Sequence, residues 1–177
     1  MPLDMRIDES LETTAADIIN ESGEESLADL IFQYGQDRAS RRIARYIVRR
    51  RQQEPITTTG QLAQVVAAAL ATPGKKHRSR IHPATRTFQA LRIAVNHELE
   101  NLEQLLDAAP QLLRKDGYVA IISYHSLEDG MVKRDFKANQ AEGVYRLVTK
   151  RPIVPSLEEI AVNRRARSAK LRIARKN

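Results

Sequence analysis

A run of six residues, YVAIIS at 118–123, constrains the fold of this chain more than any other segment. The run is apolar without alternation, and KDG at 115–117 predicts a turn immediately before it. A continuous apolar run of this length is typical of a strand that is buried on both faces of an α/β sheet. We therefore expect an α/β core around this strand, with neighbouring strands on both of its sides.

The segments on either side of this strand carry helical and extended patterns in turn. Apolar residues at helical spacing predict long helices, and short β-branched or alternating runs predict strands. Ser156 and Glu159 have the spacing of a capping box, which predicts the start of a short helix. The predicted elements are helices over 83–109, 126–138 and 157–162 and strands over 144–150 and 169–175.

The first part of the chain has an almost wholly helical pattern. Residues 10–53 carry apolar stripes at helical spacing, with a break or junction expected at Gly35 and an end before Pro55. Thr58 or Thr59 is suited to cap a further helix. The inward positions of that helix would be Leu62, Val65, Val66 and Ala69.

The whole pattern predicts an α/β sheet that is interrupted by an all-helical insert. Residues 1–9 would be the end of a core strand and its loop, and 10–80 the inserted subdomain. Residues 81–177 would form the remaining part of the core. Within the insert, TPGKKHRSR at 72–80 predicts a basic, exposed turn.

Composition narrows the class of protein. The chain has 177 residues, of which 42% are hydrophobic, so it can bury a core. It has no cysteine, which excludes disulfides and thiolate metal sites and favours a reducing cytoplasm. No apolar run approaches the length of a membrane span, and the first residues lack the pattern of a secretory signal. We expect a cytoplasmic protein.

The net charge of +7 is unevenly distributed. Residues 38–51 hold seven arginines and no acid, and residues 145–177 hold ten lysines or arginines against two acids. One such cluster is often only a solvated helix face, but two in a small chain favour nucleic acid, because guanidinium groups pair with phosphate oxygens. A membrane surface is less favoured, since the arginine run holds no large aromatic residue except Tyr46.

Polar residues follow the apolar strand directly. Ligands of open α/β sheets bind beyond the carboxyl ends of the strands, where Ser123, Tyr124, His125 and Ser126 lie. Ser126 suits the N-cap of the next helix, with acids in its first turn. Capping does not account for His125 or Tyr124, so either a functional site or a capped turn remains open here.

Two further polar groups are candidates. Arg86 and Asn96 lie on the predicted long helix, and an asparagine among apolar residues is costly unless it is paired. Asn96 either serves a site or ties a neighbouring loop. Asp4 and Arg6 lie close together near the start of the chain. No catalytic triad, metal-ligand spacing of the four histidines or glycine-rich phosphate loop is present, so metal is not expected.

Several of these segments together resemble one protein family. PLDMRID, ITTTGQLAQVV, HPATRTFQALRIAVNHEL, DGYVAIISYHSLEDGMVKRDFK and RSAKLRIA stand in the order of the bacterial RsmH (MraW) methyltransferases. The resemblance covers nearly the whole chain. It implies S-adenosylmethionine-dependent methylation of the N4 amino group of a cytosine in 16S ribosomal RNA. It also implies the C-terminal part of a Rossmann-like sheet with a helical domain inserted after PLDMR.

The resemblance assigns roles to the candidate residues. His125, Ser123 and Asp4 would serve the chemistry, and Tyr124, Ser126, Arg6, Arg86 and Asn96 would bind the substrate. The partner would be the small-subunit ribosomal RNA or the 30S subunit, with no membrane. The residues expected to hold the RNA backbone are Arg41, Arg42, Arg45, Arg49, Arg165, Arg167 and Lys170.

The family's cofactor loop would lie upstream of Met1, so the S-adenosylmethionine-binding residues are unknown and the isolated chain is expected to be inactive. Gly130 also replaces an arginine common after HSLED in the family. Four alternatives stay open. They are an incompletely represented methyltransferase, a non-catalytic RNA-binding remnant, one half of a split enzyme completed by a separate N-terminal chain, and an unproductive fragment. A homodimer with a second copy of the chain is a further partner that stays open.

Overall fold

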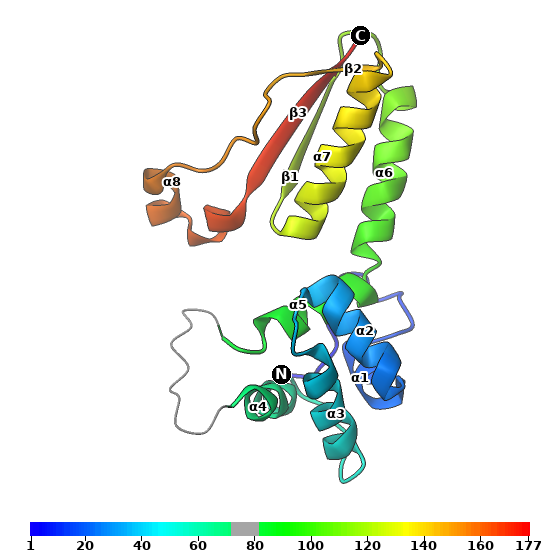
Figure 1. Ribbon diagram of the computed structural model, residues 1–177, viewed down its shortest axis with the longest axis vertical. Coiled ribbons are helices and arrows are strands. Elements are labelled where there is room, and N and C mark those ends of the chain that lie inside the picture. Colours follow the sequence, from blue (N-terminus) through cyan, green and yellow to red (C-terminus); the bar gives the residue numbers. More distant parts are fainter. Residues whose placement is uncertain (72–81) are drawn as a thin grey trace. The chain divides into compact units, whose positions relative to one another are not determined.

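The computed structural model describes residues 1–71 and 82–177 (Figure 1). These residues form two compact units, Met1–Glu98 and Leu99–Asn177, and each is described by itself. The first unit is helical, and the second combines helices with a sheet, so the α/β fold class is confirmed. The basic turn predicted over 72–80 lies outside the described residues. The assignment of 81–98 to the methyltransferase core stays a prediction.

The first unit contains five helices within its described residues. Two of them begin at capping boxes, in which the Thr14 and Thr58 hydroxyls accept hydrogen bonds from the backbone N–H groups of Asp17 and Gln61. Residues from every helix and from Leu3 and Ile56 form one continuous core. The helices are α1 (Ala15–Glu21), α2 (Glu24–Gly35), α3 (Ser40–Arg51), α4 (Thr59–Leu70) and α5 (Thr85–Val95).

The prediction of one long helix over 83–109 is wrong, because two separate helices, α5 and α6 (Glu98–Leu112), occupy this part of the chain. His97 has a φ of 49°, which no continuous α-helix allows. The Asn96 side chain accepts from the Ile7 N–H and donates to the Met5 carbonyl. Helical spacing of apolar residues continues across the break, so the sequence pattern alone could not reveal it.

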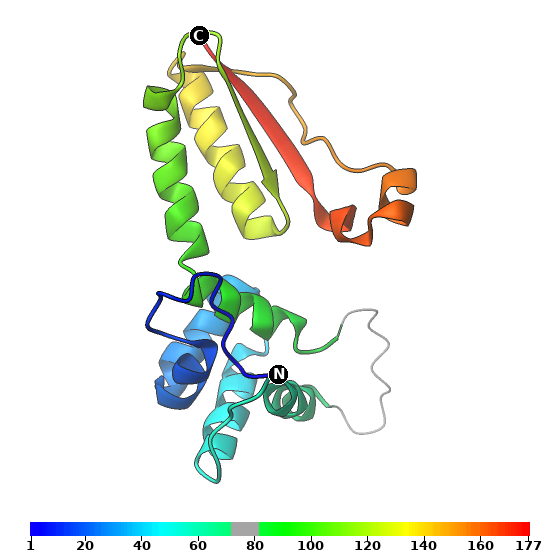
Figure 2. The same cartoon turned by 180° about the vertical axis from the view of Figure 1, so that it is seen from behind.

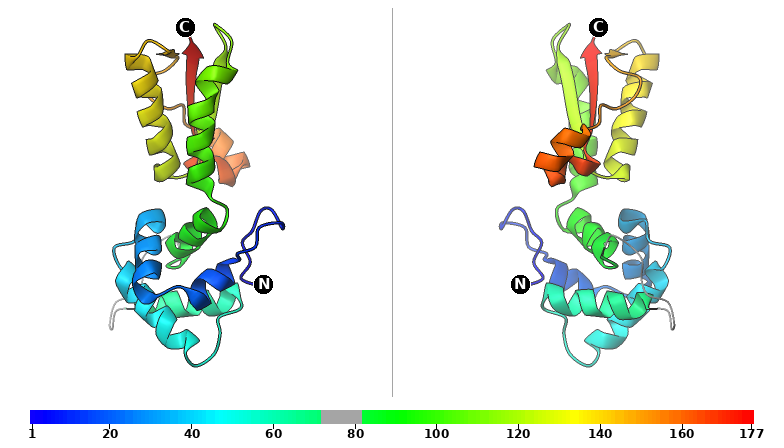
Figure 3. Two further views of the ribbon diagram at one scale, coloured as in Figure 1. Left: turned by 90° about the vertical axis from the view of Figure 1, so that its right-hand side faces the viewer. Right: turned by 90° about the vertical axis from the view of Figure 1, so that its left-hand side faces the viewer.

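The second unit packs two long helices against one face of a three-stranded sheet (Figures 1 and 3). The strand order is β1-β3-β2, and β3 pairs antiparallel with both neighbours. Phe136 of α7 packs edge-on against Tyr145 of β2 in the small core. The elements are α6, β1 (Tyr118–Ser123), α7 (Ser126–Ala141), β2 (Tyr145–Leu147), α8 (Leu157–Val162), a 3-10 helix (Arg164–Ser168) and β3 (Lys170–Lys176).

The predicted strand over 118–123 is present, but its burial on both faces is wrong. Only alternate residues face α6 and α7, whereas Tyr118 and Ile122 are 61% and 55% exposed. Within the described residues β1 pairs with β3 alone, so its other edge is open (Figure 2). An apolar run thus marks the strand correctly, while burial depends on what covers each face.

The remaining strands and the short helix agree with the sequence patterns in position. Strand β3 lies one residue beyond the predicted 169–175, and β2 is shorter than the predicted 144–150. Helix α8 spans 157–162 as expected, and the Ser156 hydroxyl accepts from the Glu159 N–H.

Candidate functional site

The turn from β1 into α7 contains the residues that were predicted as a candidate site because they follow the carboxyl end of a strand. Ser123 is 1% exposed, and its Oγ has no hydrogen-bond partner among the described residues. Tyr124, the next residue, is 54% exposed. A buried hydroxyl without a partner is costly, whereas an exposed ring next to it is available for contact with another molecule. This turn is therefore the candidate site in the second unit.

His125, and not Ser126, is the N-cap of α7, which corrects the expected cap. The His125 Nδ1 accepts from the Glu128 N–H at 3.4 Å. Glu128 Oε2 in return accepts from the Tyr124 N–H at 2.8 Å and lies 3.5 Å from His125 Nε2. Capping thus does account for His125. Because Nδ1 is the acceptor, the neutral imidazole carries its proton on Nε2.

Asp129 connects this turn to the start of β3. Its carboxylate accepts from Arg172 Nε at 2.7 Å and from Lys170 Nζ at 3.0 Å. Burial alone would raise the pKa of Asp129, but the hydrogen bonds from Arg172 and Lys170 outweigh it, so the pKa lies below its ordinary value. Sequence patterns do not reveal this anchor, because the acid and its two partners are more than 40 positions apart and meet only through the sheet.

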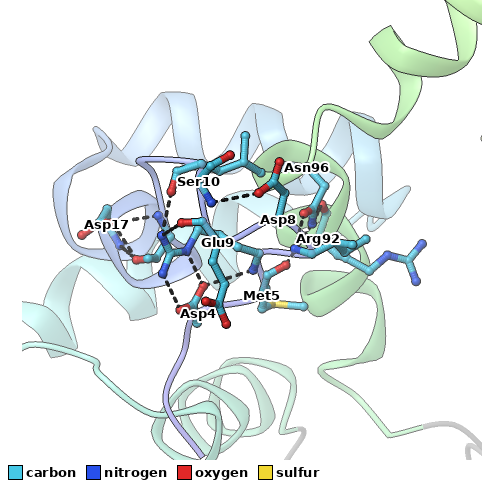
Figure 4. Close-up of polar contacts among 12 residues, drawn as sticks. Asp4, Met5, Asp8, Glu9, Ser10, Asp17, Arg92 and Asn96 are labelled. Carbon is cyan, nitrogen blue, oxygen red and sulfur yellow. Dashed lines mark hydrogen bonds and ion pairs between the residues drawn. The ribbon is translucent and has the colours of Figure 1, made fainter.

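In the first unit, Asp4 and Arg6 form a two-bond ion pair near the start of the chain (Figure 4). Arg6 Nε and Nη2 donate to the two Asp4 oxygens at 2.7 and 2.9 Å. These hydrogen bonds lower the pKa of Asp4 from 3.8 to about 2. Arg6 also donates to the Glu9 and Leu11 carbonyls. Its donors are thus directed into its own loop.

Asn96 ties this same loop to α5, as one of the two sequence interpretations proposed. Asn96 Oδ1 lies 2.7 Å from the Ile7 nitrogen, and Nδ2 donates to the Met5 and Arg92 carbonyls (Figure 4). Met5 has a φ of 68°, so the loop turns sharply where the amide holds it. Asn96 therefore determines the conformation of the residues that follow Asp4.

Arg86 lies on α5 and contacts the end of α2. Its Nη1 donates to the Gln36 carbonyl at 3.2 Å, and Gln89 donates to the Tyr34 carbonyl. These bonds satisfy carbonyls that the end of a helix leaves without partners. Arg86 thus has a structural contact at the α2–α5 junction, and a substrate contact for it remains a prediction.

The arginines of α3 divide into exposed and engaged groups. Arg51 donates to the Ile19 and Ser22 carbonyls, and Arg50 pairs with Glu54. The four that were predicted to contact RNA are exposed, although one of them, Arg45, lies 3.7 Å from Glu24. These four are Arg41, Arg42, Arg45 and Arg49.

In the second unit, Arg165 and Arg167 are exposed on the 3-10 helix. Lys170, predicted with them as an RNA contact, is engaged by Asp129. An RNA-binding role for Lys170 would have to compete with this ion pair. Arg165 and Arg167 are thus the better candidates for RNA contacts.

The described residues do not fit the methyl donor that the resemblance implies. Rossmann-type sites hold a nucleotide-like cofactor with a glycine-rich turn after a parallel strand. Here the strands are antiparallel, and the β1–α7 turn carries Tyr124 and His125 in place of glycine.

Comparison with known proteins decides the family. A profile of the MraW methylase family matches residues 1–177. The chain belongs to this family. Similar relatives are each named "Ribosomal RNA small subunit methyltransferase H". The protein of Acidobacterium capsulatum is 53% identical over 175 residues, and that of Cyanothece is 50% identical over 175. That of Acaryochloris marina is 53% identical over 172.

These alignments cover 97–99% of this chain but 55–57% of each relative, so the chain spans little more than half of their length. Membership in the family confirms the resemblance read from the sequence. Among residues 1–71 and 82–177, no helix has the length and apolar character that a membrane crossing needs.

Proposed function

We propose that this chain is the RNA-binding and base-facing part of an enzyme that methylates the N4 amino group of a cytosine in 16S ribosomal RNA. The donor would be S-adenosylmethionine, and the reaction would take place in the cytoplasm on the RNA or the 30S subunit. The observation that carries this proposal is the β1–α7 turn, with its buried, unpartnered hydroxyl beside an exposed ring. Family membership and the printed names of the relatives support the reaction class.

The turn is suited to a base that has been unstacked from RNA. An unstacked base is recognised by stacking on aromatic side chains and by hydrogen bonds to its edge. In the proposal, Tyr124 supplies the ring and the Ser123 hydroxyl supplies a hydrogen bond, with Ser126 beside them at the first turn of α7. The Glu128 carboxylate accepts a hydrogen bond from the Tyr124 N–H and so holds the backbone of the turn. A turn that is already ordered loses less conformational entropy when a ligand binds.

His125 is limited by its cap to one functional nitrogen. The N4 amine of cytosine is a poor nucleophile, because its lone pair is delocalised into the ring, so it must be oriented and must lose a proton. Nδ1 of His125 accepts from the Glu128 N–H and is not free to take that proton. We expect His125 to act as a hydrogen-bond donor through the N–H at Nε2, which lies 3.5 Å from the Glu128 carboxylate, and not as the base that takes this proton.

Asp4 is better suited to orient an amine than to deprotonate it. A pKa of about 2 makes its carboxylate a weak base at neutral pH but keeps it ionised as a hydrogen-bond acceptor. Arg6 holds it in that state. In the proposal, Arg86 and Asn96 position loops for the substrate through the contacts described above.

The exposed arginines of α3 and of the 3-10 helix would bind RNA phosphates. A non-catalytic RNA-binding remnant remains the second candidate, because the described residues lack a cradle for the donor. If the chain is one half of a split enzyme, a separate N-terminal chain would complete it. A homodimer with a second copy is a further possible assembly.

Two titrations of the 177-residue chain test the proposal. Calorimetry with S-adenosylmethionine should show no binding, and anisotropy with a labelled 16S RNA segment should show binding that weakens steeply with salt. Methyl transfer should arise only when a chain covering the N-terminal part of a relative is added, and His125→Ala should lower it. Binding of the donor by the chain alone would refute the division proposed here, and salt-independent or absent RNA binding would refute the RNA role.

A further inference from the structure

The sheet face that α6 and α7 do not cover carries an aromatic–arginine row. Strand register places Arg175 of β3 directly opposite both Tyr118 of β1 and Arg146 of β2. Residues opposite one another share a face of the sheet, so these three side chains lie on one face, across all three strands. Their neighbour along β3, Ala174, is fully buried on the helix-covered face.

The row lines a hollow of about 280 Å³, together with Leu147 and Val148. Tyr118 is 61% exposed, and Arg146 is exposed. The hollow is open, polar and about the size of the smallest ligand sites. It is therefore accessible to a ligand that presents both a flat apolar surface and negative charge.

The charges of the row are incompletely balanced. Arg175 donates to Asp116 at 2.6 Å, whereas Arg146 has no acidic partner within the described residues. Like charges on directly opposed residues of neighbouring strands repel each other and lower stability. An anion that both guanidinium groups can approach would relieve this repulsion, and phosphate matches their planar donor pattern.

We propose that Tyr118, Arg146 and Arg175 form a binding site for one nucleotide of single-stranded RNA, separate from the β1–α7 turn. Tyr118 stacks on the base, and the two arginines bind the adjacent phosphate. A free anion would not require the exposed ring, and an apolar peptide would not require two arginines, so single-stranded RNA fits the row best. This inference rests on the proposed function, because it supposes an RNA partner.

Anisotropy titration of the full chain with a labelled single-stranded RNA of about ten nucleotides tests the site. Tyr118→Leu removes the ring and should weaken binding at least about fivefold, while Tyr118→Phe retains the ring and should bind like the parent. Arg146→Gln should weaken binding and reduce the slope against salt by roughly one phosphate. Lys133→Gln, the same charge change at an exposed position of α7, is the matched control and should have less effect.

A double variant, Arg42→Gln with Arg49→Gln on α3, separates this site from the general RNA role. If the α3 variant weakens binding and the Tyr118 and Arg146 variants do not, the nucleotide site is refuted and the proposed function stands. If the parent chain binds no RNA, the RNA role itself fails. Sedimentation is measured in parallel to detect self-association of the chain. If Arg146→Gln abolishes self-association and leaves RNA affinity unchanged, the face binds a second copy of the chain, and the nucleotide site is refuted.

Discussion

The two units bury their apolar surface in different ways. In Met1–Glu98 the helices enclose one core, and residues such as Leu27 and Ile43 are fully buried. In Leu99–Asn177 the helices cover one face of the sheet, and large apolar side chains such as Ile122 remain exposed on the other. The first unit thus buries most of its hydrophobic pattern in its own core, whereas the described residues of the second leave a strand edge and one sheet face uncovered.

The largest expected difference is between core and open-face truncations. Leu91→Ala in the first unit should lower the free energy of unfolding by about 2–5 kcal/mol, because Leu91 is fully buried. Ile122→Ala should cost less than about 1 kcal/mol, because the side chain is 55% exposed. Denaturant unfolding of both variants measures this. Equal losses would show that the open face of β1 is covered in solution.

A pair of glycines tests how closely the helices of the first unit are packed. A Cβ at Gly35 would lie 2.6 Å from the Arg86 carbonyl oxygen, so Gly35→Ala should cost about 1–3 kcal/mol. Gly60 lies in α4, with no described atom within 4 Å of a Cβ, and Gly60→Ala should stabilise by about 0.5–1 kcal/mol. Thermal unfolding compares the two. An unchanged melting temperature for Gly35→Ala would mean that α2 and α5 pack less closely than this distance indicates.

Two asparagines allow long-range and local side-chain hydrogen bonds to be compared. Asn96→Ala should cost about 1–3 kcal/mol, because it leaves the Ile7 N–H and the Met5 carbonyl without their partner. Asn139→Ala removes bonds only to Asp135 of its own helix and should cost less. Amide exchange at Ile7 gives a direct readout. Unchanged protection there in Asn96→Ala would show that something else holds the loop.

The smallest expected effects concern two carboxyl groups whose contributions to folding stability change with pH in opposite directions. The lowered pKa of Asp4 contributes stability above pH 3.8, and this is lost as the pH falls towards about 2. Burial, with the charge of Asp107 second, raises the pKa of Asp135, so stability falls as the pH rises through that pKa. NMR titration of the carboxyl groups should show a lowered pKa for Asp4 and a raised pKa for Asp135. A pKa of Asp135 at or below its ordinary value would be the contrary result.

Local patterns were sufficient for several features of the fold. The strand at 118–123 and the short helix over 157–162 were predicted in place, and the cap predicted at Thr58 or Thr59 is Thr58. The order of the motifs was also sufficient to predict the family. Each of these features depends on residues close together in the chain, or on a match of segments.

Other features depended on contacts between distant residues. The break at Asn96 follows from its bonds to the loop after Asp4, about 90 positions away. Asp129 acquires its partners, and Tyr118 its neighbouring arginines, only when β3 pairs beside β1.

The sequence by itself determined where most helical and extended segments lie and to which family the chain belongs, because short-range periodicity and capping are encoded locally. Only the tertiary structure decided which face of β1 is covered, which nitrogen of His125 is engaged and which charges lie side by side. The physical reason is that burial, hydrogen bonding and charge balance belong to pairs of groups, and folding selects those pairs.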